Sequence, residues 1–516
     1  MNNLEFIRKL YNGKNCYSDP MTAEEIGLIH INSRIESIIE KLVLSHKVIF
    51  LTGNPGDGKT YIIKTLDEAV HKVNAYVESD INSVPDLNKV INEIVDCYRN
   101  SRACLIAVNE YPFLKLTQGL KRLAPDIYKE LINVKKNSIV YDLPKYNADK
   151  LFIIDLNERN LLDKDSSLVN EILKKLEVLL SSSKGINKQL DYNLCSLEND
   201  FIKEQLLELF GLASIGGEHF AIRDILGAIS YMITACIRED GDDNQSLAYY
   251  DALFSGSNGL LEYLKRFDPI FLSRPSLDEA IWNGDSLEGW QIAVPETWPK
   301  DFENVEEATA CFKSLKRRYY FENTCAADLC LLQHREYLQC SDIFKNIDTK
   351  KKVIKEDIVR SINKLFLPSD DDKKILRIWT THSYDLSRET SAAVSSRYID
   401  TSELDILSPR PADWLKGMEY TPSHILIKPK ARSSPVLVLD IDFLCILFNI
   451  KSGYPVGLLS SQYEQAASIF LKQLDDDGLT EEYEDGEIII ANRSKSYKKS
   501  IFIENNKYSF DEGGNN

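Results

Sequence analysis

The 516-residue sequence lacks any apolar run of about 18 residues, the length that a helix needs to cross a membrane. Its first residues also lack the apolar core of a signal peptide. The ten cysteines are scattered rather than spaced as a disulfide framework, which is typical of reduced thiols. We therefore expect a cytoplasmic protein with no membrane partner.

Positive charge is in the minority, with 62 Lys and Arg against 79 Asp and Glu and a formal net charge of −17. The average field of such a surface repels a polyanion, so we expect weak and salt-sensitive DNA binding by the isolated chain. Contact with DNA is then expected only within an assembly. Short basic stretches could still act locally, although such stretches more often mark a solvated face: residues 313–318, 428–432 and 493–499.

Recognisable nuclease motifs are also missing, so cutting of DNA is not expected of this chain. One group of possible metal ligands remains, formed by Cys325, Cys330, His334 and Cys340. Its spacing has no glycine or proline turn between ligands, unlike a standard zinc knuckle. Cysteines on the apolar face of a helix explain the group better, and zinc stays the alternative.

What the sequence does contain is VIFLTGNPGDGKT, residues 48–60, an apolar strand that runs into a glycine-rich turn and then a helix. It matches the P-loop pattern G-x-x-x-x-G-K-[ST], in which backbone N–H groups surround phosphates, the lysine contacts the β and γ phosphates, and the hydroxyl binds Mg²⁺. A glycine-rich turn without a ligand is the alternative. The pattern predicts a site for ATP and Mg²⁺ formed by Gly53, Asn54, Pro55, Gly56, Asp57, Gly58, Lys59 and Thr60.

Strand-like and helix-like segments alternate through the first third of the chain, with strands expected at 74–80, 103–108 and 150–159. This alternation predicts an α/β fold with a parallel sheet, and together with the P-loop it predicts a P-loop NTPase core over residues 1–165. Apolar residues at helical spacing predict a helical region over 166–300, which resembles the lid of an AAA+ module, and a helical middle region over 301–400. The resemblance implies an AAA+-like core. Residues 401–516 are expected to form a mixed α+β domain.

Polar residues follow two of the expected strands, where a parallel sheet gathers its ligands. We interpret Glu110 as the residue that orients the attacking water and Asp155 as a carboxylate for Mg²⁺, together with Thr60. Asn157 is the candidate for a sensor near the γ-phosphate. Alternatively, Leu151 to Asp155 is the Walker B strand, or one of the two acids caps the following helix.

Arginines can stabilise the charge that develops during phosphoryl transfer. Arg223, in the first turn of an apolar lid helix, is our candidate to reach back to the nucleotide, and a surface ion pair is the alternative. A neighbouring subunit could also donate an arginine. Candidates for such donation are Arg159, Arg317 and Arg318.

Several segments, in order, resemble the DptF family, ATPase subunits of bacterial DNA-phosphorothioation-dependent restriction systems. They are TGNPGDGKT, LIAVNEYPF, FIIDLNERNLL, FAIRDILGAI, LLEYLKRFDP, SLKRRYYFE, HILIKP and LDIDFLCILFNIKSGYP. The resemblance spans most of the chain, and its only specific motif is the P-loop. It implies a P-loop ATPase that acts with partner proteins, among them a HerA-like helicase or translocase, to restrict DNA lacking the sulfur modification.

Asn109 stands where a Walker B aspartate is expected, which departs from the usual pattern. The alternative function is therefore a nucleotide-gated switch, or a scaffold, with slow or no hydrolysis. ATP hydrolysis measured with and without DNA separates the ATPase from the switch, and nucleotide binding separates both from the scaffold.

Overall fold

The computed structural model describes residues 3–11, 22–81, 84–141, 146, 148–166, 168–215, 218–237, 246–272, 274–283, 288–292, 302–329, 332–381, 392–455, 461–492, 497–504 and 507–511. The chain divides into two compact units. Unit 1 comprises residues 1–335 and 411–421, and unit 2 comprises 336–410 and 422–516. Within the described ranges, every helix is too short or too polar to cross a lipid bilayer.

Unit 1 contains a parallel four-stranded sheet with the order β2-β3-β1-β5. Its strands are β1 (Val48–Thr52), β2 (Tyr76–Glu78), β3 (Cys104–Val108) and β5 (Leu151–Asp155). The last residue of β1, Thr52, is in register with Val108 and with Asp155, so these three strands end side by side. The expected α/β class with a parallel sheet is confirmed.

Helices cover both faces of this sheet because successive strand residues point to opposite sides. Phe50 belongs to a core with α6 (Leu87–Arg99), α7 (Glu110–Leu123) and α8 (Pro125–Lys136). Leu51 belongs to a second core with α3 (Arg34–Leu44), α4 (Lys59–Thr65) and α5 (Asp67–Lys72). Burial on both faces explains why the sheet strands are recognisable as continuous apolar runs.

The rest of unit 1 is mainly helical from residue 168 onwards. These helices are α9 (Leu168–Leu180), α10 (Lys188–Glu198), α11 (Asp200–Ile215), α12 (Ile222–Thr234), α13 (Tyr249–Ser255), α14 (Gly259–Leu264), α15 (Pro275–Asn283) and α16 (Val305–Glu322), with α1 (Asn3–Lys9) and α2 (Ala23–Ile29) from the beginning of the chain. The hydroxyl of Ser230 in α12 donates to the carbonyl of Ile7 in α1, which ties the chain's first helix to this helical part.

A late segment of the chain, residues 411–421, also belongs to unit 1. Leu415 and Met418 lie in the core that contains α3. Glu419 is buried and accepts hydrogen bonds from Arg159 Nε at 3.0 Å and from the backbone N–H of Arg34 at 3.1 Å. The sequence pattern places these residues in the C-terminal domain instead, because no local pattern reveals a partner some 260 positions away.

Unit 2 combines helices with three antiparallel sheets. The helices are α17 (Leu332–Lys345), α18 (Ile347–Phe366), α19 (Ile441–Lys451) and α20 (Ser461–Asp476). The first sheet has the order β10 (Leu404–Leu407), β12 (His424–Pro429), β13 (Leu437–Asp440), and the second has the order β14 (Glu481–Glu482), β9 (Arg397–Asp400), β6 (Ile375–Arg377). Two further short strands lie outside these sheets: β4 (Ile139–Val140) belongs to unit 1, and β11 (Arg410–Pro411) spans the boundary between residues 410 and 411.

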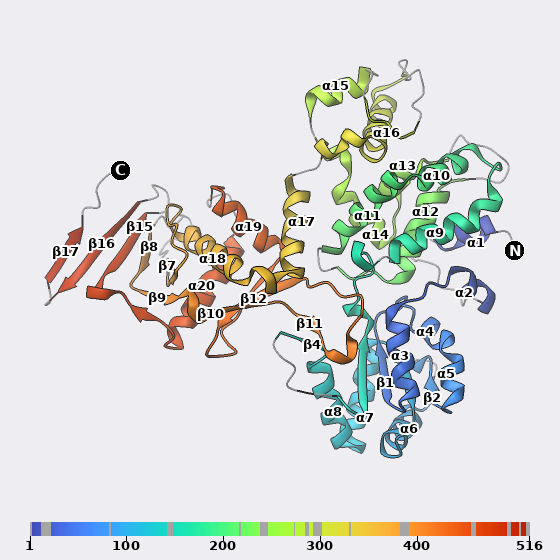
Figure 1. Cartoon of the computed structure of the whole chain (residues 1–516), viewed down its shortest axis with the longest axis horizontal. Helices are drawn as coiled ribbons and strands as arrows, with labels where there is room; N and C mark the ends of the chain where they lie inside the picture. Colours follow the sequence, from blue (N-terminus) through green and yellow to red (C-terminus); the bar gives the residue numbers. More distant parts are fainter. Residues whose placement is uncertain are drawn as a thin grey trace. The chain divides into compact units, whose positions relative to one another are not determined.

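The third sheet of unit 2 has five strands (Figure 1). Its order is β17 (Lys507–Asp511), β16 (Tyr497–Glu504), β15 (Ile488–Asn492), β8 (Ala392–Ser395), β7 (Thr380–Thr381). The C-terminal region, expected to be a mixed α+β domain, contains the strands β10 to β17 together with the helices α19 and α20. The helical middle region predicted over 301–400 instead contains β6 to β9 in its last part, since β8 and β9 pair with strands about a hundred residues later in the chain.

Candidate functional site

Residues 53–60 comprise the loop between β1 and α4 and the first two residues of α4, and we call them the glycine loop. The backbone of this loop depends on its glycines. Gly56 and Gly58 have φ angles of +103° and +84°, in the region that side chains disfavour. At Gly53, an added Cβ would lie 2.6 Å from Asp57 Oδ2, so the loop also has no space for a side chain there. The local sequence therefore fixes a tight loop immediately after a buried parallel strand.

The side chain of Lys59 folds back over this loop. Its ammonium donates hydrogen bonds to the carbonyl oxygens of Gly53 and Asn54, both at 2.7 Å. Burial lowers the pKa of Lys59, while the negative charges of Asp57 and Asp155 oppose this shift. The predicted cation thus lies against the backbone of the loop, within the electrostatic field of the predicted carboxylate Asp155.

The side chain of Asp57 is buried and accepts a hydrogen bond from the backbone of the loop; 3% of the residue's surface is accessible. Its Oδ2 accepts a hydrogen bond from the N–H of Asn54 at 2.5 Å, and its Oδ1 lies 2.7 Å from His219 Nε2. Burial lowers the pKa of His219, but the hydrogen bond to Asp57 and the charge of Asp57 outweigh burial and raise it. Sequence reasoning missed His219, because it lies 162 positions from its partner in a segment without a motif.

The end of β5 approaches the same loop through Asn157. The side-chain oxygen of Asn157 accepts a hydrogen bond from the N–H of Asn54 at 3.1 Å. Asp155 accepts the N–H of Asn157 at 3.1 Å, and so caps the short 3₁₀ turn Leu156–Glu158. The capping role considered as an alternative is therefore real for Asp155, although its charge also acts on Lys59.

Arg223 lies against the glycine loop from the first turn of α12. Its backbone N–H donates to the carbonyl of Gly56 at 3.4 Å. A Cβ built on Gly56 would lie 3.3 Å from Arg223 Nε, so the guanidinium group is adjacent to the loop. The structure thus brings this predicted residue to the predicted site from a distant part of the sequence.

Thr60 contacts the end of β2, whereas Asp155, its predicted partner in binding Mg²⁺, lies at the end of β5. Its hydroxyl donates to the carbonyl of Ser79 at 3.4 Å, directly after β2. Ser79 stands between Glu78 and Asp80, two acids that sequence reasoning missed. Asp155 lies at the end of β5, on the other side of β1. The signal that could have found these acids was the polar ending of the expected strand 74–80.

Glu110 begins α7, directly after β3, and is exposed. Since β3 is next to β1 and Val108 is in register with Thr52, Glu110 emerges beside the start of the glycine loop. Among the described residues, no hydrogen bond or ion pair joins Glu110 to Lys59 or Thr60. Its assignment as the water-orienting residue stays a prediction.

The three arginines considered for donation to a neighbour are engaged within unit 1. Arg159 pairs with Glu419 at 3.0 Å and Arg318 pairs with Glu322 at 2.8 Å, each with at most 8% of its side chain exposed. Arg317 contacts Asp251 at 3.0 Å and Asp268 at 2.6 Å. In this conformation all three arginines hold the fold together, so their availability to a neighbour would require these ion pairs to break.

The cysteine and histidine group does not form a described metal site. Cys325 is exposed in unit 1, whereas Cys340 is buried in unit 2 with its Sγ 3.3 Å from Cys445 Sγ. Cys330 and the side chain of His334 lie outside the described residues. Within the part of the chain that is described, no three His, Cys, Asp or Glu side chains gather as metal ligands.

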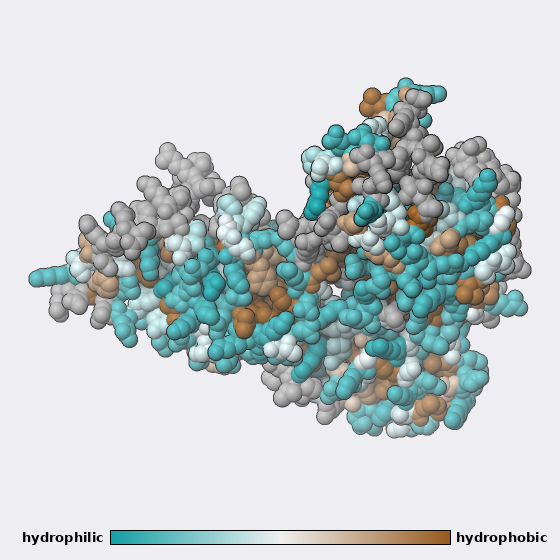
Figure 2. Space-filling view, turned by 45° about the horizontal axis from the view of Figure 1, so that its top comes forward, coloured by the Kyte–Doolittle hydropathy of each residue, from teal (hydrophilic) through white to brown (hydrophobic). Residues whose placement is uncertain are grey.

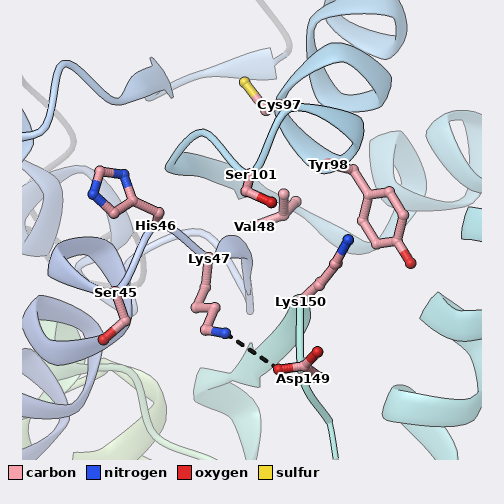
Figure 3. A pocket seen from close by; sticks show the side chains of 9 residues that line it. All are labelled: Ser45, His46, Lys47, Val48, Cys97, Tyr98, Ser101, Asp149 and Lys150. Carbon is pink, nitrogen blue, oxygen red and sulfur yellow. Dashed lines mark hydrogen bonds and ion pairs between the residues drawn. The ribbon is translucent and has the colours of Figure 1, made fainter.

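A cavity of about 110 Å³ opens at the opposite end of the parallel sheet (Figure 3). In it Lys47 Nζ lies 3.4 Å from Asp149 Oδ1, and Lys150 Nζ lies over the ring of Tyr98 at 5.5 Å from its centroid. Its lining residues are Ser45, His46, Lys47, Val48, Cys97, Tyr98, Ser101, Asp149 and Lys150. The cavity lies at the amino ends of β1 and β5, whereas the predicted site residues gather at their carboxyl ends.

Comparison of the chain with protein-family models, with curated proteins and with solved structures finds no match. A function for the chain must therefore be argued from the geometry of the glycine loop and its neighbours.

Proposed function

We propose that this chain is an ATPase subunit that binds ATP and Mg²⁺ at the glycine loop. The observation that carries the proposal is the placement of Lys59 against the backbone of a loop whose glycines leave little room for side chains. A loop of this kind, after a buried parallel strand and before a helix, is a common phosphate-binding arrangement.

Lys59 and Thr60 of the loop, and Arg223 beside it, then have definite roles. The ammonium of Lys59 exchanges its two carbonyl partners for phosphate oxygens, and its partial burial strengthens that attraction. Arg223 supplies a second positive charge from α12. A bound Mg²⁺ would neutralise charge on the phosphates. Thr60 would hold that ion, with carboxylates from Asp155, Glu78 or Asp80 in its water shell.

Hydrolysis requires a group that orients water, and Glu110 is the residue that we assign to it. Asn109 is the N-terminal cap of α7 and Glu110 is its first helical residue, at the carboxyl end of β3. Because Glu110 is exposed, closure by a partner or by DNA would be needed to exclude water around it. This supports a subunit whose turnover is fast only in an assembly.

The resemblance of the quoted segments to the DptF family supports placing this activity in a bacterial system that restricts DNA and defends against phages. The partners would be other subunits of that system, including a HerA-like helicase or translocase. DNA would be contacted through the assembly, consistent with the net charge of −17.

A second candidate is a nucleotide-gated switch with slow or no hydrolysis. Two observations favour it: Asn109 replaces an acid at the end of β3, and the hydrogen bonds of Asn54 and His219 connect the glycine loop to β5 and to the segment before α12. Nucleotide binding at the loop could then change those contacts without turnover.

Nucleotide binding is tested first by calorimetry with ATP and Mg²⁺ on the full chain. We expect Lys59→Ala to weaken binding by roughly a hundred-fold or more, because hydrogen bonds to charged groups contribute about 1.5–3 kcal/mol each. Lys64→Ala is the matched control, since Lys64 is an exposed lysine further along α4. Equal binding by both variants would refute the proposed site.

Hydrolysis is then measured for the chain alone, with DNA, and with its co-purifying partners. The ATPase proposal expects turnover that rises with partners and depends on Lys59. Tight binding with no turnover under any of these conditions would favour the switch.

A further inference from the structure

The five-stranded sheet of unit 2 ends in β17, which pairs with β16 on one side. Within the described residues no strand pairs with its other side. Such an edge carries backbone N–H and C=O groups that can form hydrogen bonds with a further strand. Edge strands of natural proteins are usually guarded by charges or proline, whereas the middle of β17 is Tyr508, Ser509 and Phe510.

The side chains of this edge are strongly exposed. Tyr508 and Phe510 have 69% and 66% of their surface accessible, and both point to the same face because they are two positions apart. Tyr508 is in register with Ile503 and Phe510 with Ile501 on β16, and Ile503 is itself 38% exposed. On the face drawn in Figure 2, hydrophobic residues stand in groups among hydrophilic ones.

The sequence of β17, KYSFD, is complementary to itself when two copies run antiparallel about Ser509. In that register Tyr508 of each copy lies opposite Phe510 of the other, which gives two aromatic cross-strand pairs. Lys507 falls opposite residue 511, an aspartate in the sequence, so opposite charges pair at both ends. A two-fold axis through Ser509 makes every contact occur twice.

We propose that two copies of this chain associate through β17, joining their five-stranded sheets into one continuous antiparallel sheet. The partner is a second copy because the charge pattern of β17 complements its own reverse. The aromatic face supplies apolar contact, and the open backbone edge supplies the hydrogen bonds.

The association should be weak and concentration-dependent. Pairing of one five-residue strand covers less surface than the roughly 1,000 Å² that stable interfaces exceed. We therefore expect a dissociation constant at or above about 1 µM, which is typical of small transient interfaces. Sedimentation velocity of the full chain over a concentration series measures it.

Charge reversal tests the register. Lys507→Asp places like charges opposite each other twice, and should weaken the dimer roughly five- to thirty-fold. The double variant Lys507→Asp with Asp511→Lys restores opposite charges and should return the dissociation constant to within about three-fold of the unaltered chain. Lys498→Asp, at an exposed lysine of β16 away from the edge, is the control and should leave association unchanged.

Several results would overturn the proposal. These are a chain that stays monomeric up to about 1 mM, a dimer that Lys507→Asp does not weaken, or a double variant that is not restored. Circular dichroism of each variant establishes that the fold is retained.

Lys499 shares the aromatic face, since it is two positions from Ile501, so single-stranded DNA is the competing occupant. A fluorescent oligothymidine that binds this face while the chain stays monomeric would replace our proposal.

Discussion

The parallel sheet of unit 1 and the five-stranded sheet of unit 2 contain the same residue type in opposite environments. Phe50 in β1 is completely buried, with its ring 6.1 Å from the ring of Phe113 in an edge-to-face arrangement. Phe510 in β17 is 66% exposed. Among the described residues, the first sheet has helices on both faces, whereas the second presents an aromatic face and an unpaired edge.

The strands of the two sheets therefore have different roles, one in the core of unit 1 and the other at the surface of unit 2. In unit 1 the strands are buried on both faces, and residues that follow β5 and β2 contact the glycine loop at the carboxyl ends of these strands. In unit 2 the strands form a surface, so the same apolar residue type is available for association. Buried aromatics contribute to stability through packing, while exposed ones contribute little until a partner covers them. Matched variants in the two units test this contrast, beginning with the largest expected effect.

The two phenylalanines give the most direct test. Phe50→Ala should cost about 3–5 kcal/mol of unit 1 stability, because it leaves a cavity against Phe113. Phe510→Ala should change the stability of unit 2 by less than about 0.5 kcal/mol. Hydrogen exchange with mass spectrometry reports each unit separately, which matters because the two units need not unfold together. Similar losses for both variants would contradict the contrast between the sheets.

Ion pairs should show the same contrast between a buried and an exposed setting. Glu419→Ala removes the partner of Arg159 in unit 1 and should cost about 3–5 kcal/mol, since a buried guanidinium is left unpaired. Asp477→Asn removes the exposed partner of Arg432 in unit 2, at 3.8 Å, and should cost no more than about 1 kcal/mol. Urea unfolding of each variant measures the difference, and equal losses for the two variants would contradict the contrast between buried and exposed ion pairs.

The polar strand ends of unit 1 can be ranked by kinetics. If Glu110 orients water, Glu110→Gln should keep ATP affinity and lose roughly ten- to a thousand-fold in turnover. Asp80→Asn and Asp155→Asn should instead weaken Mg²⁺-dependent nucleotide binding, and the larger loss identifies the metal carboxylate. We expect it for Asp80, because Thr60 contacts Ser79 beside it. Full turnover by Glu110→Gln would move the water-orienting role to Glu158.

The smallest expected effect is the pH dependence of the contact between His219 and Asp57. The pKa of His219 is raised above its ordinary value of 6.5 in the folded chain. The contact between protonated His219 and Asp57 therefore contributes fully to stability below pH 6.5. This contribution is lost as the pH rises through the higher pKa that His219 has in the folded chain. The stability of unit 1 should fall over that range in the unaltered chain and not in His219→Gln. An NMR titration of His219 with a pKa below 6.5 would reverse this expectation.

Local sequence patterns predict much of unit 1. The apolar runs of β1, β3 and β5 and the glycine loop can be recognised because burial on both faces and glycine conformations leave signals within a few residues. Such patterns point to Arg223, Asn157 and Lys59, and these three residues lie together at the loop. Their roles toward a nucleotide stay predictions.

Other features could not be predicted because the residues that contact each other lie far apart in the chain. The pairing of Asp57 with His219, the burial of Arg159 against Glu419 and the return of residues 411–421 to unit 1 each join segments more than 150 positions apart. The same reason explains why the pattern predicts a helical region where β8 and β9 lie, since the partners of these strands come much later.

By itself, the sequence determined the spacing of apolar residues, the glycine loop and the net charge. The first two depend on residues that are close together in the chain, and the net charge is a sum over all residues. Only the tertiary structure decided which strand end contacts Thr60, which arginines are buried in ion pairs and which strand forms an exposed edge. These depend on strand order and on packing between distant segments, and such contacts leave no trace in local sequence.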